Sequence, residues 1–341
     1  MTNSTIGLDH TTAAAQHAPA RFLMEPGRSL APLPENLTAS VIICAYTENR
    51  WSDVCDAIDS LRAQTVPVHQ VVLVIDHNDR LMTMANDAFA DFGVDILANS
   101  DLKGLSGARN TGVLACTSDV IAFLDDDASA EPDWLEQLLA AYDNADVAGV
   151  GGSAAPRWPV DRPRWFPREF DWVIGCSYVG LPTEQASVRN FIGCNMSFRR
   201  DVFDQIGTFA NGLGRVDAVP LGCEETEFCI RVKQAIPSAI LRLEPKSFVN
   251  HRVSTDRVEF KYFKNRCIAE GLSKAAVSGM VGSSDGLESE RDYTLKTLPR
   301  AVVRGFAMAW RSPSGLLRSG AVIAGLGFTV YGYAKGLLKR R

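Results

Sequence analysis

The 341-residue sequence predicts an α/β protein, a mostly parallel β-sheet with helices on both faces. Between residues 39 and 142, short apolar runs alternate with segments of helical periodicity, which is the pattern of a parallel sheet. The apolar runs show no polar alternation, so both sides of their strands should be buried. Acidic residues follow several of these runs, where such sheets bind ligands. The content of 46% hydrophobic and 22% charged residues is that of a soluble globular protein.

The expected elements follow one another in order. Trp51, Val54, Cys55, Ile58 and Leu61 recur at helical spacing after the first apolar run. A Gly-rich stretch opens the third helix, and an early proline in the fourth is tolerated in the first helical turn. The expected strands cover residues 39–46, 68–76, 94–100 and 119–127. The expected helices cover residues 49–64, 81–93, 104–116 and 131–142.

Polar residues lie at the carboxyl ends of three expected strands. Tyr46 ends the first, Asp76 ends the second, and the fourth closes with three consecutive aspartates, residues 125–127. Because these ends meet at one edge of a parallel sheet, the side chains should converge in one crevice. Each ionised aspartate raises the cost of ionising the next, so the triplet indicates a bound cation.

The chain divides into three expected regions. Residues 1–36 are small, polar and Pro-containing and should form a disordered extension. The main α/β domain should cover residues 37–275, and a helical, membrane-associating region residues 276–341. The eight cysteines contain no CxxC pair, and no signal peptide opens the chain. A reducing cytoplasm without a zinc site or a disulfide framework is expected.

The C-terminal region is basic and apolar. From Lys296 onward there are nine basic residues and no acidic one. The whole chain has a net charge of −5, so the residues before Lys296 carry a net charge of −14. The stretch 320–334 carries no charge. It is short for a membrane span, although an extension to Leu338 would reach that length. Three readings stay open: a spanning helix, a helix lying in the membrane interface, or a hairpin packed on the main domain.

Five motifs together resemble one family. They are "SVIICAYTENRW", "QTVPVHQVVLVID", "GLSGARNTGVLACTSDVIAFLDDDA", "GCNMSFRRDVF" and "GCEETEFCIRV". In this order and spacing they are similar to the inverting family 2 glycosyltransferases, over about residues 38–275. The resemblance implies the GT-A fold, a Rossmann-like sheet with helices on both faces. Within the family, the sequence resembles membrane-associated transferases that extend lipid-linked sugars, such as dolichyl-phosphate-glucose glucuronosyltransferases.

The resemblance implies a metal site and a cofactor. Asp127 would touch the metal, while Asp125 and Asp126 would face the ribose, the base or metal-bound water. His251 would be a further ligand, and oxygen ligands suit Mn²⁺ or Mg²⁺. The cation would stabilise the leaving diphosphate. The alternatives are a solvated acidic turn and a structural histidine.

The resemblance also implies a nucleotide site. Asp76 would accept a hydrogen bond from the base, although His77 departs from the usual acidic pair of the family and leaves the base open. The other expected donor contacts are Ala45, Tyr46, Glu48 and Arg109. Arg109 should lie close to the base or phosphate, at the start of a helix. The alternatives are packing for Tyr46 and a solvated helix cap for Arg109.

The remaining implied roles concern the acceptor. Glu225 would be the general base, supported by Glu224, with Glu227 one turn away in an open role. The alternative is a charged helix face that complements the helix dipole. Asn195 would line the donor and acceptor sugars, and Arg266 would bind a diphosphate or a lipid phosphate.

The predicted function is a metal-dependent transfer from a nucleotide-sugar donor, UDP-linked, to a glycan or polyprenyl-linked acceptor. The enzyme should be peripheral on the cytoplasmic face of the membrane, on an anionic surface, with no nucleic-acid partner. Two other functions stay open. A nucleotidyltransferase would be expected to carry a Gly-rich loop after the first strand, and "CAYTENRW" has no glycine. A non-catalytic sugar-nucleotide-binding scaffold would be expected to lack Glu225 or the aspartate triplet.

Overall fold

The computed structural model describes residues 28–211, 222–282, 292–310 and 312–339. The expected N-terminal extension therefore lies outside the described residues as far as residue 27. Residues 28–38 form no helix or strand, yet they contact the domain. The backbone N–H of Ala31 donates to Asp201 (3.1 Å), and Arg199 donates to the Ala31 carbonyl (2.5 Å). This part of the extension is thus held against the domain.

The described strands form one mixed sheet of nine strands in the order β3-β2-β1-β4-β8-β6-β9-β5, with β7 paired to β9. The strands β3, β2, β1 and β4 are mutually parallel, and β8 joins β4 antiparallel. Their bounds are β1 (Ala39–Ala45), β2 (Gln70–Ile75), β3 (Val94–Ala98), β4 (Val120–Asp125), β5 (Ala128–Ala130), β6 (Val147–Arg157), β7 (Ala186–Ser187), β8 (Asn195–Arg199) and β9 (Ile240–Arg252).

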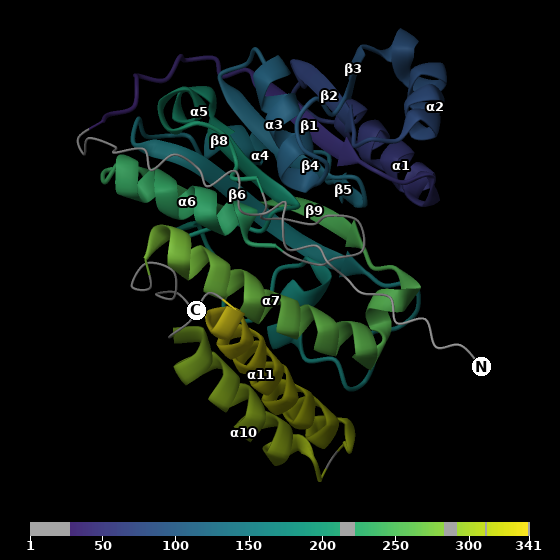
Figure 1. Cartoon of the computed structure of the whole chain (residues 1–341), viewed down its shortest axis with the longest axis vertical. Coiled ribbons are helices and arrows are strands. Elements are labelled where there is room, and N and C mark those ends of the chain that lie inside the picture. The colour runs from purple at the N-terminus through teal and green to yellow at the C-terminus, as the bar shows by residue number, and fades with distance from the viewer. Residues whose placement is uncertain (1–27, 212–221, 283–291, 311, 340–341) are drawn as a thin grey trace.

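The helices of the catalytic domain cover both faces of this sheet, as predicted (Figure 1). One face packs against α1, α2 and α4, and the other against α3, α5 and α6. Along β1, Val41 and Ile43 point to the first face, whereas Ile42 points to the second. The helix bounds are α1 (Trp51–Arg62), α2 (Asp79–Phe89), α3 (Leu105–Ala115), α4 (Trp134–Ala140), α5 (Arg200–Ile206), α6 (Glu224–Ala235), α7 (Phe260–Val281), α10 (Leu298–Met308) and α11 (Ser314–Lys339).

The expected strand over 119–127 divides in two. β4 ends at Asp125, residues 126 and 127 form a turn, and β5 follows. β5 pairs antiparallel with β9, so the chain must leave the parallel sheet at this point. Consequently, the last two aspartates lie in the turn that connects β4 to β5.

A third apolar cluster joins the catalytic domain to the C-terminal helices. Its buried aromatic residues are Phe166, Phe170 and Phe263, and the C-terminal helices contribute Leu298 and Val322. α7 supplies Phe263 and extends to Val281, across the domain boundary expected at residue 275. Helices α10 and α11 form a hairpin beside α7, at the end of the molecule remote from the parallel strands (Figure 1).

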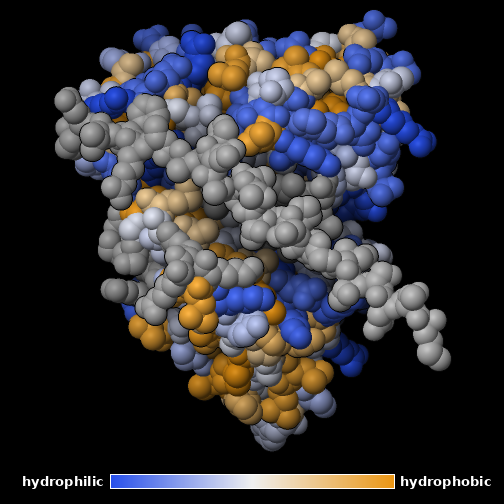
Figure 2. All heavy atoms as spheres, in the orientation of Figure 1, coloured by the Kyte–Doolittle hydropathy of each residue, from blue (hydrophilic) through white to orange (hydrophobic). Residues whose placement is uncertain are grey.

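The C-terminal region forms a helical hairpin that packs on α7, and its relation to a membrane stays a prediction. Within the described residues, Ser314–Leu338 is one helix that is long and apolar enough to cross a membrane, and 22% of its most apolar window is buried. Much of the surface of this helix is therefore both apolar and accessible. A hairpin that only exposed a basic face to solvent would not need such a surface. Figure 2 shows apolar side chains gathered over this end of the molecule.

Glycines set the distance between α7 and α11. A Cβ added at Gly332 would lie 2.1 Å from the Ile268 carbonyl oxygen, and one at Gly271 would lie 2.1 Å from that of Thr329. A Cβ at Gly327, also on α11, would meet nothing within 4 Å. The two helices therefore approach backbone to backbone through the first two glycines and not through the third.

We predict that Gly332→Ala lowers the free energy of unfolding by about 1–3 kcal/mol, because the helices must move apart. Gly327→Ala, the matched control on the same helix, should be neutral or stabilising by up to about 1 kcal/mol, because alanine favours helix. Denaturant unfolding followed by circular dichroism measures both. Equal stability of the two variants would contradict the backbone contact.

Candidate active site

A cavity of about 1160 Å³ opens beyond the carboxyl ends of β1, β2 and β4. The strand register explains this position, since Ala45 pairs with Ile75 and Cys44 pairs with Asp125, so that the three strands end level. The residues that follow the strand ends face the cavity, as predicted. They include Ala45, Tyr46, Asp76 and Asp125–Asp127.

Asp125, Asp127 and His251 form a group that could hold a metal ion. One ligand atom from each lies within 4.8 Å of the others. The pairing of β5 with β9 creates the group, because Ala128 lies opposite His251 and the Arg252 N–H donates to the Asp127 carbonyl (2.8 Å). His251 Nε2 lies 3.1 Å from Asp127 Oδ1. Two carboxylates and an imidazole fit a divalent cation.

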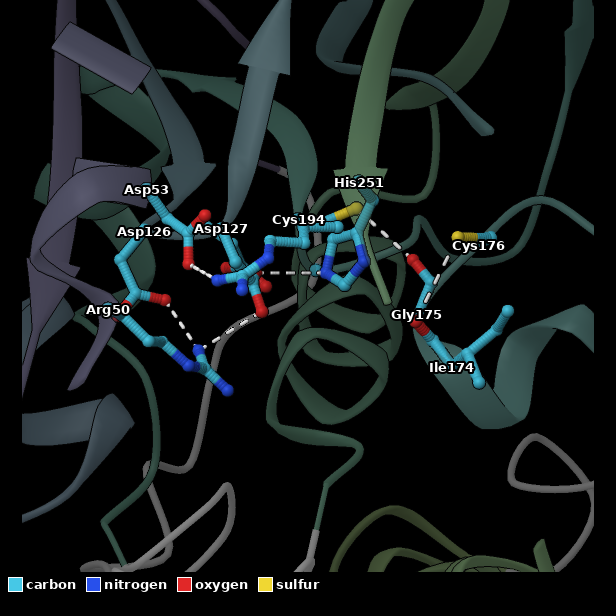
Figure 3. A network of polar contacts seen from close by, with 12 residues as sticks. Arg50, Asp53, Asp126, Asp127, Ile174, Gly175, Cys176, Cys194 and His251 are labelled. Carbon is cyan, nitrogen blue, oxygen red and sulfur yellow. Dashed lines mark hydrogen bonds and ion pairs between the residues drawn. The ribbon is translucent and has the colours of Figure 1, made fainter. Parts of the chain in front are cut away.

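Three cationic groups surround Asp127, with Arg50 on one side and His251 on the other (Figure 3). Arg50 Nη1 lies 2.7 Å from Asp126 Oδ1 and 3.1 Å from Asp127 Oδ2, and Arg257 Nη2 lies 3.4 Å from Asp127 Oδ2. Burial opposes ionisation, but His251 and Arg257 hold the pKa of Asp127 well below its usual range. Arg50 and Arg257 also line the cavity, and sequence reasoning missed both. The only indication in the sequence was their position: Arg50 comes shortly after Tyr46, and Arg257 comes shortly after His251.

Asp126 differs from Asp127 in its surroundings. Its Oδ2 is buried and has no hydrogen-bond partner among the described residues. Burial is the main reason that the pKa of Asp126 is raised, and the neighbouring Asp127 adds to it, while Arg50 opposes the shift. An oxygen that is buried beside the cluster without a partner can accept a hydrogen bond from a ligand in the cavity.

Asp76 ties three segments together at the end of β2. Its carboxylate accepts hydrogen bonds from Asn99 Nδ2 (2.7 Å) and the Gly104 N–H (3.0 Å), and His77 Nδ1 lies 2.9 Å away. His77 has a positive φ of 50°, which is uncommon outside glycine. Asp76 still lines the cavity, so its predicted contact with the base stays a prediction.

The first strand end brings Ala45 and Tyr46 to the cavity, but not Glu48. The Arg50 guanidinium lies 5.7 Å from the centre of the Tyr46 ring. Glu48 accepts a hydrogen bond from Asn78 Nδ2 (3.1 Å) and does not line the cavity. The expected contact of the Glu48 side chain with the nucleotide therefore has no support in this geometry.

Arg109 is buried in the cavity wall, with only 2% of its surface exposed. Its Nη1 donates to Glu224 Oε1 (2.8 Å), and its Nη2 donates to the Gly193 carbonyl (2.9 Å) and lies 3.4 Å from Asp125 Oδ1. Both terminal nitrogens are thus engaged by the protein. Arg109 links the metal-binding group to the start of α6, a role that its sequence position did not indicate.

Glu225 lies in the first turn of α6 and faces the cavity. Cys223, the residue before this helix, has a φ of 72°. This left-handed backbone conformation sets the direction in which α6 begins, and with it the positions of Glu224 and Glu225. Burial, together with the adjacent Glu224, raises the pKa of Glu225 to about 8. A carboxylate with such a pKa is a stronger base than an ordinary carboxylate, and it becomes the main form of the group above about pH 8. Glu227, in contrast, is ion-paired with Arg231 (2.9 Å).

Arg266 also reaches the cavity, from α7. It contacts Glu270 (2.9 Å), which in turn contacts Lys274 (3.2 Å). Burial opposes ionisation of Glu270, but the two cations lower its pKa to about 2. The wall continues into the C-terminal helices, which the sequence did not associate with the site. They contribute Tyr293, Lys296, Arg300, Leu326, Thr329, Val330 and Tyr333.

The prediction that Asn195 lines the sugar site is wrong. Asn195 is fully buried and is absent from the cavity wall. Its Oδ1 accepts from Trp134 Nε1 (2.8 Å), and its Nδ2 donates to the carbonyls of Ser153 and Ser247 (both 2.9 Å). A buried amide among apolar neighbours needs such partners. The same pattern in sequence is shared by structural and ligand-binding asparagines.

Comparisons with known proteins agree with this geometry. The profile described as "Glycosyl transferase family 2" matches residues 40–207. The glucosyl-dolichyl phosphate glucuronosyltransferase of Haloferax volcanii is 34% identical over 240 residues, 70% of this chain and 76% of that protein. The succinoglycan biosynthesis protein ExoM of Rhizobium meliloti is 26% identical over 244 residues, 70% of this chain and 74% of that protein.

Solved structures share the fold at low identity. The mannosyltransferase PcManGT of Pyrobaculum calidifontis, in complex with GDP-Man and Mn²⁺, has a TM-score of 0.58 and 17% identity, covering 92% of this chain and 90% of that one. GalNAc-T7, with UDP, GalNAc and Mn²⁺, has a TM-score of 0.52 and 18% identity, covering 76% and 55%. The GT-A-like fold is thus confirmed.

We predict that Asn195→Ala lowers the free energy of unfolding by about 3 kcal/mol or more, because it removes the acceptor of the buried Trp134 Nε1 and the donor to the carbonyls of Ser153 and Ser247. Below its melting temperature, the variant should bind sugar nucleotide as the wild type does. Denaturant unfolding and a donor titration measure the two effects. Unchanged stability with weakened donor binding would return Asn195 to the sugar site.

Proposed function

The chain belongs to glycosyl transferase family 2, and we propose that it transfers a sugar, with inversion, from a nucleotide-sugar donor to a hydroxyl of a polyprenyl-linked acceptor at the cytoplasmic face of a membrane. It is a glycosyltransferase, so a nucleotidyltransferase and a non-catalytic scaffold lose their support. The observation that carries the proposal is the Arg109 bridge, which holds the metal-binding group and the Glu225 helix in one cavity wall.

Asp125, Asp127 and His251 would hold the cation in this proposal. The cation would neutralise the negative charge that develops on the leaving diphosphate. Imidazole is a better ligand for Mn²⁺ than for Mg²⁺, so a site containing His251 favours Mn²⁺. Before the cation binds, Arg50 and Arg257 balance the charge of Asp127. Both arginines line the cavity and would be suitable partners for diphosphate oxygens.

Glu225 would take the proton of the acceptor hydroxyl as the oxygen attacks the sugar. Its raised pKa supports this role, because the deprotonated carboxylate is then a stronger base. Glu224 is engaged by Arg109 and positions the helix start. Asp76, Ala45 and Tyr46 line the donor end of the cavity, where the nucleotide would lie.

The acceptor end of the cavity supports a lipid-linked substrate. There, Leu326, Val330 and Tyr333 of α11 provide an apolar surface, and Lys296 and Arg300 are cations in the same wall. A polyprenyl phosphate needs both kinds of contact. The Haloferax relative is named for a glucosyl-dolichyl phosphate acceptor, which has the same chemistry. Arg266 is a cation of α7 on the Glu225 side of the wall, beside Gly222.

A transfer assay tests the proposal. The full-length protein is first screened by thermal melting against UDP- and GDP-sugars with and without Mn²⁺, and the donor found is then supplied with a glycosylated polyprenyl phosphate. We expect a UDP-sugar to raise the melting temperature only with Mn²⁺. Asp127→Asn should remove this shift and lower turnover by at least about 10²-fold, because a ligand charge is lost. Its own melting curve checks the fold. Normal turnover of the variant in Mn²⁺ would refute the metal assignment.

Glu225→Gln should keep donor affinity within about twofold and lower the transfer rate by about 10²-fold or more, as expected for a lost general base. The wild-type rate should rise with pH and level off above about pH 8, because Glu225 must lose its proton to act and its pKa is raised to about that value. The rate of the variant should lack this rise.

Glu227→Gln is the matched control, since the same chemical change is made on the same helix at a residue that pairs with Arg231. It should retain turnover within a few-fold. A rate that falls with pH across the same range, or equal losses of binding and turnover in Glu225→Gln, would contradict the assignment of the base.

A further inference from the structure

We propose that the protein binds the membrane in a monotopic manner. The closed end of the α10–α11 hairpin, described residues 303–310 and 312–317 and called here the hairpin tip, enters one leaflet, while the C-terminal half of α11 stays packed on the protein. This inference rests on the proposed function, because a lipid-linked acceptor is what requires the contact. It adds the mode of binding and the residues that achieve it.

Large apolar side chains are exposed at the hairpin tip. Trp310 is 82% exposed and Leu317 is 56% exposed, and these are accompanied by Phe306, Met308 and Leu316. These residues lie beside the turn between α10 and α11, at the end of the molecule remote from the parallel strands (Figure 1). Five large exposed apolar side chains within residues 306–317 are a concentration that indicates an interaction site, whereas singly scattered apolar residues need no explanation. Tryptophan is also enriched where proteins meet the membrane interface.

Cations surround the tip and favour an anionic lipid surface over a protein partner. Arg304 and Arg318 are exposed on the hairpin, and Arg318 Nε donates to the carbonyl of Arg164 (3.1 Å), which is also exposed. Arg304 is paired with the buried Glu169, so the two charges balance and the net positive charge of the described residues near the tip comes from Arg318 and Arg164. No acidic residue occurs in the sequence after Lys296. Apolar insertion and phosphate contacts thus act together.

The hairpin is closed tightly enough to enter as a unit. A Cβ at Gly305 would lie 2.1 Å from Ser319 Oγ and 2.7 Å from the Gly315 carbonyl oxygen, so the helices touch through small residues. Ser319 Oγ donates to the Val302 carbonyl (3.0 Å). In the turn, the Ser312 N–H donates to the Met308 carbonyl (2.9 Å). Such bonds lower the cost of moving the turn into the interface.

The contacts of α11 argue against a membrane span. At Gly325, Gly332 and Gly336 the helix packs on Phe170, Phe263 and α7, where added Cβ atoms would approach within 2.1–2.6 Å. The part of α11 before Gly325 begins at Ser314. At 1.5 Å per residue it is about 16 Å long, about half of the hydrocarbon thickness. A span would therefore require α11 to leave the catalytic domain.

Flotation of the full-length protein with vesicles tests this inference. The vesicles consist of phosphatidylcholine, with and without about 30% phosphatidylglycerol. The test variant is Leu316→Ser/Leu317→Ser, whose changes are at exposed positions and should not disturb folding. Leu114→Ser is the matched control, because Leu114 is 80% exposed on α3 within the catalytic domain. We expect the partition coefficient of the double variant to fall about tenfold or more, and that of the control to change less than about twofold.

Quenching by brominated lipids measures depth. Tryptophan fluorescence should be quenched more by bromines near the headgroup end of the acyl chain than by bromines near the bilayer centre. Trp310→Phe should remove most of this quenching. Unchanged flotation of the double variant would overturn the inference, as would a C-terminal tag that is protected from protease inside sealed vesicles, since that indicates a span. A dimer that ignores vesicles would assign the patch to a second copy and also overturn it.

The two proposals fail separately. If the double variant binds vesicles normally but the wild type transfers sugar to the polyprenyl acceptor, the membrane inference is wrong and the proposed function stands. If vesicle binding behaves as expected but no sugar is transferred, the membrane inference stands and the proposed function is wrong. The Mn²⁺-dependent melting shift should be the same in the double variant and the wild type, because the tip lies outside the donor end of the cavity.

Discussion

The buried guanidinium of Arg109 is the interaction on which the site depends. It joins Asp125 at the end of β4 to Glu224 at the start of α6, and it also binds the Gly193 carbonyl. Burying the Arg109 cation without acidic partners would cost free energy. Asp125 and Glu224 compensate its charge, and Arg109 in turn holds these two carboxylates in place. The candidate metal site and the start of α6 come from distant parts of the chain, and this single side chain connects them.

Charge balance around the aspartate triplet follows the same logic. Three adjacent carboxylates would repel one another, yet Arg50, Arg257 and His251 compensate Asp127 in its buried position. The cluster can therefore form in the folded chain before a cation binds. A cation that binds to Asp127 must then share this carboxylate with the positively charged side chains or displace them. The same cations are suitable partners for a diphosphate, so one arrangement serves both folding and binding.

The third apolar cluster connects the cavity to the C-terminal hairpin. Phe170 and Phe263 pack against α11 on one side, and Phe170 also lines the cavity on the other. This part of the cavity wall and the C-terminal hairpin are consequently parts of one packed unit. A deletion of the hairpin would expose this cluster, whereas substitutions at the tip change only accessible side chains, which makes them the sharper probe.

The sequence by itself determined the α/β class, the family and the residues at the strand ends, because periodicity and the order of motifs are local properties. It also indicated Glu225, Asp127 and His251 as candidates. Only the tertiary structure decided that Asn195 is a core amide, that Arg109 bridges two acidic groups, and that α11 packs on α7. These depend on which segments pair across the sheet: β5 beside β9 brings His251 to Asp127, and backbone contact at Gly332 holds α11 in place. Such long-range pairings leave no periodic signal in the chain.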